Sequence, residues 1–260
     1  MSILIITGIA GTLIAILPAF IIFFYIARFK GRMWLSAVLG GVFWFIALLA
    51  RTPILAGLEL LGIFITSEML LVYLAIIIFL AALMAGLFEE GIKYLFLKRQ
   101  PKWIETTQYV LCFGLGWGLG EAFLIYVIDV LAYAFLYPFL STIISLPPEY
   151  ILAQNFLIGA VERNIAIVFH VSATILIALA VWHKKLKFLW LAIFVHFLFD
   201  FIPLIILQFL LYPILGSTLT AVLIVETLFA VYAVIFAVLA FYLWKWEKVT
   251  VPLKLETESI

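Results

Sequence analysis

Seven long runs of hydrophobic residues, separated by short polar segments, make up most of the chain. They cover about residues 3–26, 33–50, 70–97, 105–138, 152–182, 188–213 and 219–244. A membrane-spanning helix needs about 20 consecutive apolar residues, and in hydrocarbon every backbone amide must be bonded within the spanning structure. The pattern therefore predicts an all-α, polytopic membrane bundle of about seven transmembrane helices.

Composition supports the same class. Hydrophobic residues make up 68% of the 260 residues and charged residues 11%, and the mean hydropathy is +1.33. A water-soluble domain needs more charge to cover its surface, so we expect the lipid bilayer as solvent and no nucleic-acid partner. The single cysteine, Cys112, excludes an internal disulfide framework and a multi-cysteine metal cluster.

Basic residues gather at every second boundary between the runs. Under the positive-inside rule these clusters lie in the cytoplasm, which predicts an N-terminus outside, a cytoplasmic C-terminus and a multi-pass protein of the cell membrane. We expect one transmembrane domain over 1–248 and a cytoplasmic tail over 249–260. The clusters comprise Arg28, Lys30 and Arg32; Lys98, Arg99 and Lys102; Lys184, Lys185 and Lys187; and Lys245 and Lys248.

The segment 52–68 complicates the count. It is apolar but short beside its neighbours, and Pro53 follows Arg51, a basic residue on the side assigned to the outside. We interpret 52–68 as re-entrant, interfacial or spanning, with an outer re-entrant or interfacial helix as the working hypothesis.

The third run contains the sequence FEEGIK, with Glu89, Glu90 and Lys93. Ionisable side chains at membrane depth are costly and mark functional sites. Glu89 and Lys93 are four residues apart, so they can pair on one helix face. The adjacent carboxylate then needs another partner or serves as a base.

The fourth and fifth runs carry further ionisable groups. Glu121 follows GLGWGLG, whose glycines allow close helix approach, and we expect it deep in the bundle. In the fifth run, Arg163 and His170 are seven residues apart and share a face. Glu162 or Glu121 can neutralise Arg163, and we interpret Glu121, Glu162 and Arg163 as an outer packing network.

The sixth run contains HFLFD, in which His196 and Asp200 lie one turn apart. This spacing suits an imidazole oriented by a carboxylate, as metal ligands and catalytic bases require. His196 is about 13 Å from the basic boundary at about 1.5 Å per residue, the depth also expected for Glu89 and Glu90. Glu226, near the outer end of the seventh run, is interpreted as structural.

The ordered motifs FEEGIKYLFLK, GLGWGLGE, ERNIAIVFHVSATILI and VHFLFDF resemble those of the YhfC family of intramembrane metalloproteases. That family is grouped with type II CAAX prenyl endopeptidases, PrsW proteases and the seven-helix scaffold subunit of γ-secretase. The resemblance covers about residues 33–245. It departs at Trp117, where the family tends to have a histidine, and at Lys93, where related enzymes often carry arginine.

The resemblance implies a protease site whose catalytic residues are Glu89, Glu90, His170 and His196. The supporting residues that it implies are Lys93, Glu121, Arg163 and Asp200. One glutamate would activate water. The histidines would either bind a metal or stabilise the oxyanion of the reaction intermediate. In the first case the metal would be zinc, and its ligands would be His170, His196 and Glu90. The substrate would be a membrane protein or a lipidated peptide.

Two other functions use the same residues. A non-catalytic scaffold, similar to the γ-secretase subunit, would keep the buried polar contacts for helix packing and bind a membrane-protein partner. A proton or ion transporter would use the carboxylates and histidines as a relay, although no inverted repeat is evident.

Overall fold

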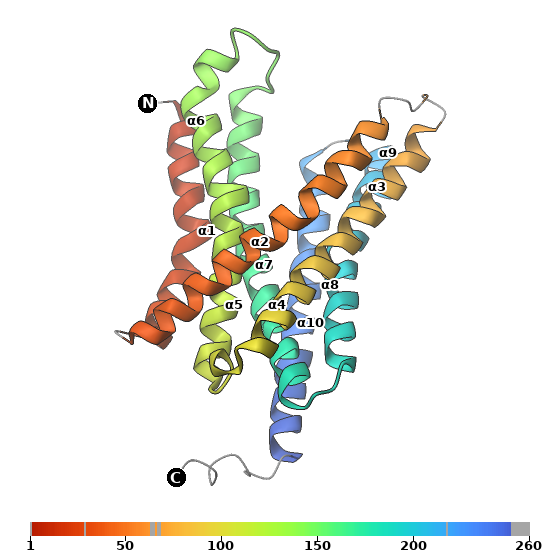
Figure 1. The fold of residues 1–260 in the computed structure, drawn as a ribbon. Helices are drawn as coiled ribbons and strands as arrows, with labels where there is room; N and C mark the ends of the chain where they lie inside the picture. The colour runs from red at the N-terminus through yellow and green to blue at the C-terminus, as the bar shows by residue number, and fades with distance from the viewer. Residues whose placement is uncertain (1, 29, 63–65, 67–68, 217, 251–260) are drawn as a thin grey trace.

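A computed structural model describes residues 2–28, 30–62, 66, 69–216 and 218–250, and among these it is built from helices (Figure 1). Seven of the described helical stretches are long and apolar enough to cross a membrane, which confirms the predicted multi-pass bundle. The helices are α1 (Ile3–Ala27), α2 (Gly31–Leu61), α3 (Leu70–Ala85), α4 (Gly91–Arg99), α5 (Thr107–Glu121), α6 (Ile128–Leu140), α7 (Glu149–Trp182), α8 (Lys187–Ile206), α9 (Tyr212–Leu215) and α10 (Leu219–Thr250).

Three spans contain a π-helical turn. These turns are η2 (Gly86–Glu90), which joins α3 to α4, η4 (Ala122–Val127), which joins α5 to α6, and η5 (Leu207–Leu211), which joins α8 to α9; a short 3₁₀ turn, η3 (Pro101–Trp103), precedes α5. A π turn inserts an extra residue and changes the direction of the side chains that follow, and such turns occur frequently at functional sites. Here η2 contains both glutamates of FEEGIK, and η4 begins directly after Glu121.

The segment 52–61 does not form a separate helix. It continues α2 without a break, so the hypothesis of a re-entrant or interfacial helix is wrong for these residues. Pro53 has no amide to donate to the carbonyl four residues earlier, yet the helix continues through it, and the Thr52 hydroxyl donates to the carbonyl of Leu48. Residues 63–65 and 67–68 of the predicted segment lie outside the described residues.

The connections separate into two ends of the molecule (Figure 1). The end of α1 and the start of α2 lie at one end of the molecule, together with the α4–α5 and α7–α8 links and the C-terminal end of α10. The end of α2 and the start of α3 lie at the other, together with the α6–α7 link, the end of α9 and the start of α10. The basic clusters therefore lie at one end, as the alternation requires. That this end faces the cytoplasm remains a prediction.

Helix α5 is held tightly between α2 and α7 by its glycines. A Cβ atom on Gly116 would lie 1.9 Å from the Ala37 carbonyl oxygen of α2, and one on Gly118 would lie 2.8 Å from the Ile167 Cα of α7. Only glycine permits both approaches. This packing also fixes the positions of Trp117 and Glu121, two polar side chains of α5.

Candidate active site

A polar cavity of about 460 Å³ lies among α2, α3, η2, α5, α7, α8 and α10. Its ionisable wall residues come from six of the described spans, and none of these spans supplies all of them. They are Arg51, Glu89, Glu121, Glu162, Arg163, His170, His196, Asp200 and Glu226. No soluble domain is needed to build this cavity, because each residue is carried on a membrane span.

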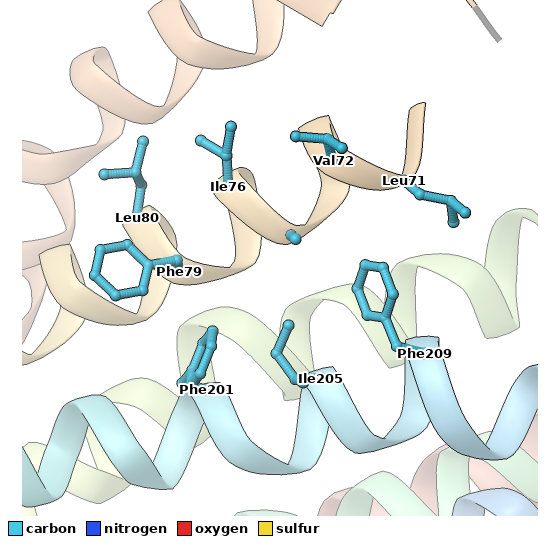
Figure 2. A pocket seen from close by; sticks show the side chains of 9 residues that line it. Leu71, Val72, Ile76, Phe79, Leu80, Phe201, Ile205 and Phe209 are labelled. Atoms are coloured by element: carbon cyan, nitrogen blue, oxygen red, sulfur yellow. The ribbon is translucent and has the colours of Figure 1, made fainter. Parts of the chain in front are cut away.

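A larger groove of about 580 Å³ lies between α3 and α8, and apolar side chains line it throughout. Figure 2 shows Phe201 and Ile205 of α8 pointing toward α3, and the ring of Phe79 of α3 packs edge-on against that of Phe201. The groove contains none of the ionisable residues. We therefore place the candidate site in the smaller polar cavity, where acid–base or metal chemistry has the groups it requires.

Glu90 is fully buried and joins two other buried residues. Its carboxylate accepts hydrogen bonds from the Lys93 ammonium at 2.9 and 3.0 Å and lies 3.0 Å from His196 Nδ1. Lys93 therefore pairs with Glu90, three residues before it, and not with Glu89, the partner that the spacing allowed; Glu89 contacts α2 instead. His196 Nε2 lies 3.6 Å from Asp200, so the two residues are neighbours as their spacing predicted, at a distance longer than a hydrogen bond.

Each carboxylate oxygen of Glu89 accepts a hydrogen bond from a different helix. One oxygen accepts a hydrogen bond from Arg51 Nη1 at 2.8 Å, and the other accepts one from the indole Nε1 of Trp117 at 3.1 Å. Arg51 lies in the middle of α2, and its side chain is 13% exposed, so its expected place at an outer boundary is wrong. Sequence reasoning missed Arg51 as a site residue. Its signal was a lone arginine inside what proves to be one 31-residue apolar helix.

Glu121 joins the residues of α7 to the same site. It accepts a hydrogen bond from Arg163 Nη1 at 2.6 Å, and its other oxygen lies 2.5 Å from His170 Nε2. Arg163 also contacts Glu162, as expected for the residues that neutralise it. The separate outer packing network is wrong, however, because Arg163 and His170 lie two turns apart on one face of α7 and Glu121 bridges them.

These contacts bring the predicted catalytic residues together. Ligand atoms of Glu89, Glu121 and His170 all lie within 4.8 Å of one another, and the rings of His170 and His196 are 5.6 Å apart. Glu226, which we interpreted as structural, lies in the cavity wall as well, whereas Asp129 is exposed.

Glu89, Glu121 and His170 could hold a metal. Two carboxylates and one imidazole are oxygen and nitrogen ligands of the kind that zinc takes in catalytic sites, where a fourth position stays open. This set differs from the predicted His170, His196 and Glu90, because Glu90 does not line the cavity and its carboxylate faces Lys93 and His196. The His170 Nδ1 atom is buried and has no partner within the described part of the chain, as is also true of Arg51 Nε and Glu226 Oε2 in the same wall.

The formal charge of the wall also suits a cation. It has five carboxylates (Glu89, Glu121, Glu162, Asp200 and Glu226) against two arginines (Arg51 and Arg163). With neutral histidines, the excess is three negative charges at membrane depth, where unpaired charge is costly. A divalent cation would offset most of this excess, so the residues present fit a metal.

Comparison with known proteins agrees with the geometry. No curated protein and no solved structure matches the chain. The model of one family, YhfC intramembrane metalloprotease, matches residues 13–226, which include all of the wall residues described above. The chain therefore belongs to the YhfC intramembrane metalloprotease family.

Proposed function

We propose that the chain is a metal-dependent endopeptidase that hydrolyses a peptide bond in or beside the membrane at the polar cavity. The observation that carries this proposal is the convergence of Glu89, Glu121 and His170 within 4.8 Å beside the buried Glu90–His196 pair. A ligand set and an oriented imidazole in one cavity are the parts that metal-assisted hydrolysis requires.

Glu89, Glu121 and His170 are the proposed metal ligands. The metal, for which zinc is our candidate, would supply a Lewis acid that polarises a carbonyl oxygen and lowers the pKa of water. Arg51 and Trp117 hold the Glu89 carboxylate in place, and Arg163 holds Glu121. Such partners orient ligands and set metal affinity.

His196 is the proposed proton acceptor. An Nδ1–H that donates to Glu90 leaves the lone pair of Nε2 available on the cavity side. The imidazole can take a proton from water at Nε2 and return it to the leaving amine. Asp200, 3.6 Å from Nε2, can stabilise the imidazolium between these two steps.

Glu90 then acts through His196 rather than on water directly. It is completely buried and is not one of the cavity-wall residues, so a water molecule that attacks the substrate in the cavity is not within its reach. Lys93 neutralises it and fixes its orientation at hydrogen-bond distance. Each of the four residues predicted as catalytic thus has a role in the proposal: Glu89 and His170 are metal ligands, His196 is the proton acceptor, and Glu90 is a positioning residue.

The membrane setting defines the substrate class. An intramembrane protease acts on substrates that reside in the bilayer, so we propose a membrane protein or a lipidated peptide as substrate. Leu55, Leu204 and Phe229 supply apolar wall beside the ionisable groups, which suits a peptide segment whose side chains are hydrophobic.

The test uses the full chain in proteoliposomes with a library of single-span peptides. We expect cleavage that a chelator abolishes and that added Zn²⁺ restores. Glu121→Gln and His196→Gln should each lower the rate by at least about 100-fold, as loss of a metal ligand or general base does. Asp129→Asn removes an exposed carboxylate from the same span and should leave the rate unchanged.

Cleavage by Glu121→Gln at the parental rate would overturn the proposal. A folded parent that never cleaves would favour the scaffold, and proton or ion flux across the same liposomes would favour the transporter. These outcomes separate the three functions because the assay measures products and flux in one preparation.

A further inference from the structure

Trp117 lies between the two carboxylates of the site and contacts the surroundings of both. Its side chain is fully buried. The indole N–H donates to Glu89 Oε2 at 3.1 Å, and the Lys93 ammonium lies over the indole ring, 4.4 Å from its centroid. Lys93 in turn holds Glu90. One side chain is therefore in contact with a proposed metal ligand and with the cation that orients the Glu90–His196 pair.

We propose that Trp117 is a positioning residue that sets the orientation of Glu89 through its N–H and the orientation of Glu90 through Lys93 and the ring face. The inference rests on the proposed metallopeptidase function. It assigns two separable tasks to one residue, because the N–H and the ring face are different parts of the indole.

The N–H has a clear effect on Glu89. Arg51 holds one oxygen of that carboxylate and Trp117 holds the other, so the plane of the carboxylate is fixed at both ends. Without the indole donor the carboxylate can turn about the bond to Arg51. Loss of a hydrogen-bond partner behind a metal ligand lowers metal affinity by about 10- to 100-fold.

The ring face has a clear effect on Lys93. The ammonium is completely buried, with Glu90 on one side and the aromatic face on another. A desolvated ammonium is attracted to the face of an aromatic ring, most strongly to tryptophan. The ring therefore keeps Lys93 at the distance from which both ammonium–carboxylate bonds form.

The backbone keeps Trp117 in this position. On either side of it, Gly116 contacts the Ala37 backbone and Gly118 contacts the Ile167 backbone. Helix α5 cannot shift or turn without a clash at one of these contacts. The helix packing therefore fixes the position of the indole, and the indole sets the orientation of the two carboxylates.

The experiment compares Trp117→Phe, Trp117→Leu and Trp44→Phe in the full-length protein. Trp117→Phe keeps an aromatic face and loses only the N–H. Trp44 is the matched control, because it is fully buried in the same hydrophobic cluster and its Nε1 has no partner among the described residues. Zn²⁺ affinity is measured by equilibrium dialysis, and kcat is measured at saturating Zn²⁺.

We expect Trp117→Phe to bind Zn²⁺ about 10-fold or more weakly than Trp44→Phe, with kcat at saturating Zn²⁺ close to that of the control. Trp117→Leu should bind Zn²⁺ as weakly and lose at least about 10-fold in kcat as well, because Lys93 no longer has a ring face. The two tasks would then be separated by substitution.

Equal Zn²⁺ affinity in Trp117→Phe and Trp44→Phe would overturn the role of the N–H. Equal kcat in the Phe and Leu variants would overturn the role of the ring. If Trp117→Leu does not fold, Trp117→Met replaces it, because Met also lacks a ring face, and a kcat unchanged from Trp117→Phe counts against the ring. Zn²⁺ binding and cleavage by the parent test the proposed function itself, so the two failures are distinguishable.

Discussion

The Lys93–Glu90 pair makes a sharp prediction about stability. Both side chains are completely buried, and the ammonium is 2.9 and 3.0 Å from the two carboxylate oxygens. Lys93→Met fills similar space and leaves the buried carboxylate without its cation. Breaking a buried pair by removing one partner costs about 3–5 kcal/mol.

His196 moderates this cost. Its Nδ1 is 3.0 Å from the same carboxylate, and a protonated imidazole can replace part of the lost charge. We therefore expect the lower end of the range, a loss of about 3 kcal/mol in the free energy of unfolding for Lys93→Met. A double variant that combines Lys93→Met with Glu90→Gln also removes the unpaired negative charge, and the Gln amide oxygen still accepts a hydrogen bond from His196. The double variant should be more stable than Lys93→Met alone.

The assay is reversible unfolding in mixed micelles, followed by circular dichroism. Lys98→Met is the control, because Lys98 lies on the same helix, α4, and is exposed; it should change stability by no more than about 0.5 kcal/mol. A loss below about 1 kcal/mol for Lys93→Met, or a double variant no better than the single one, would refute a buried charged pair at this position.

Two further predictions concern packing and orientation. Gly116→Ala should destabilise the protein strongly, because the new Cβ would lie 1.9 Å from the Ala37 carbonyl oxygen. Gly91→Ala is the control and should be tolerated, because its Cβ would meet no atom within 4 Å. Thermal unfolding in detergent compares the two variants, and equal melting temperatures would contradict the close approach of α5 and α2. A fluorescent protein fused after residue 260 should fold and fluoresce in the cytoplasm and an alkaline phosphatase fused there should be inactive, as the basic end predicts; an active phosphatase would reverse the orientation.

The chain's amino-acid pattern by itself determined the class, the spans and much of the site. Hydrocarbon admits few charges and no unpaired backbone, so the apolar runs predicted the seven spans, and the isolated ionisable groups marked His170, His196 and the two glutamates of FEEGIK. The His196–Asp200 contact was predictable for the same reason, since residues one turn apart on a helix are neighbours.

Only the tertiary structure decided which helices meet. Arg51 and Glu89 are 38 residues apart, and Glu121 and His170 are 49 apart, so no local period relates them. Their contact depends on the close approach that the glycines of α5 allow. On a helix, Lys93 can reach either Glu89 or Glu90, because residues three and four apart are both neighbours. The contacts with other helices decided for Glu90, since Glu89 is held by Arg51 and Trp117. Periodicity within one helix fixes which side chains share a face, but packing between helices fixes what that face contacts.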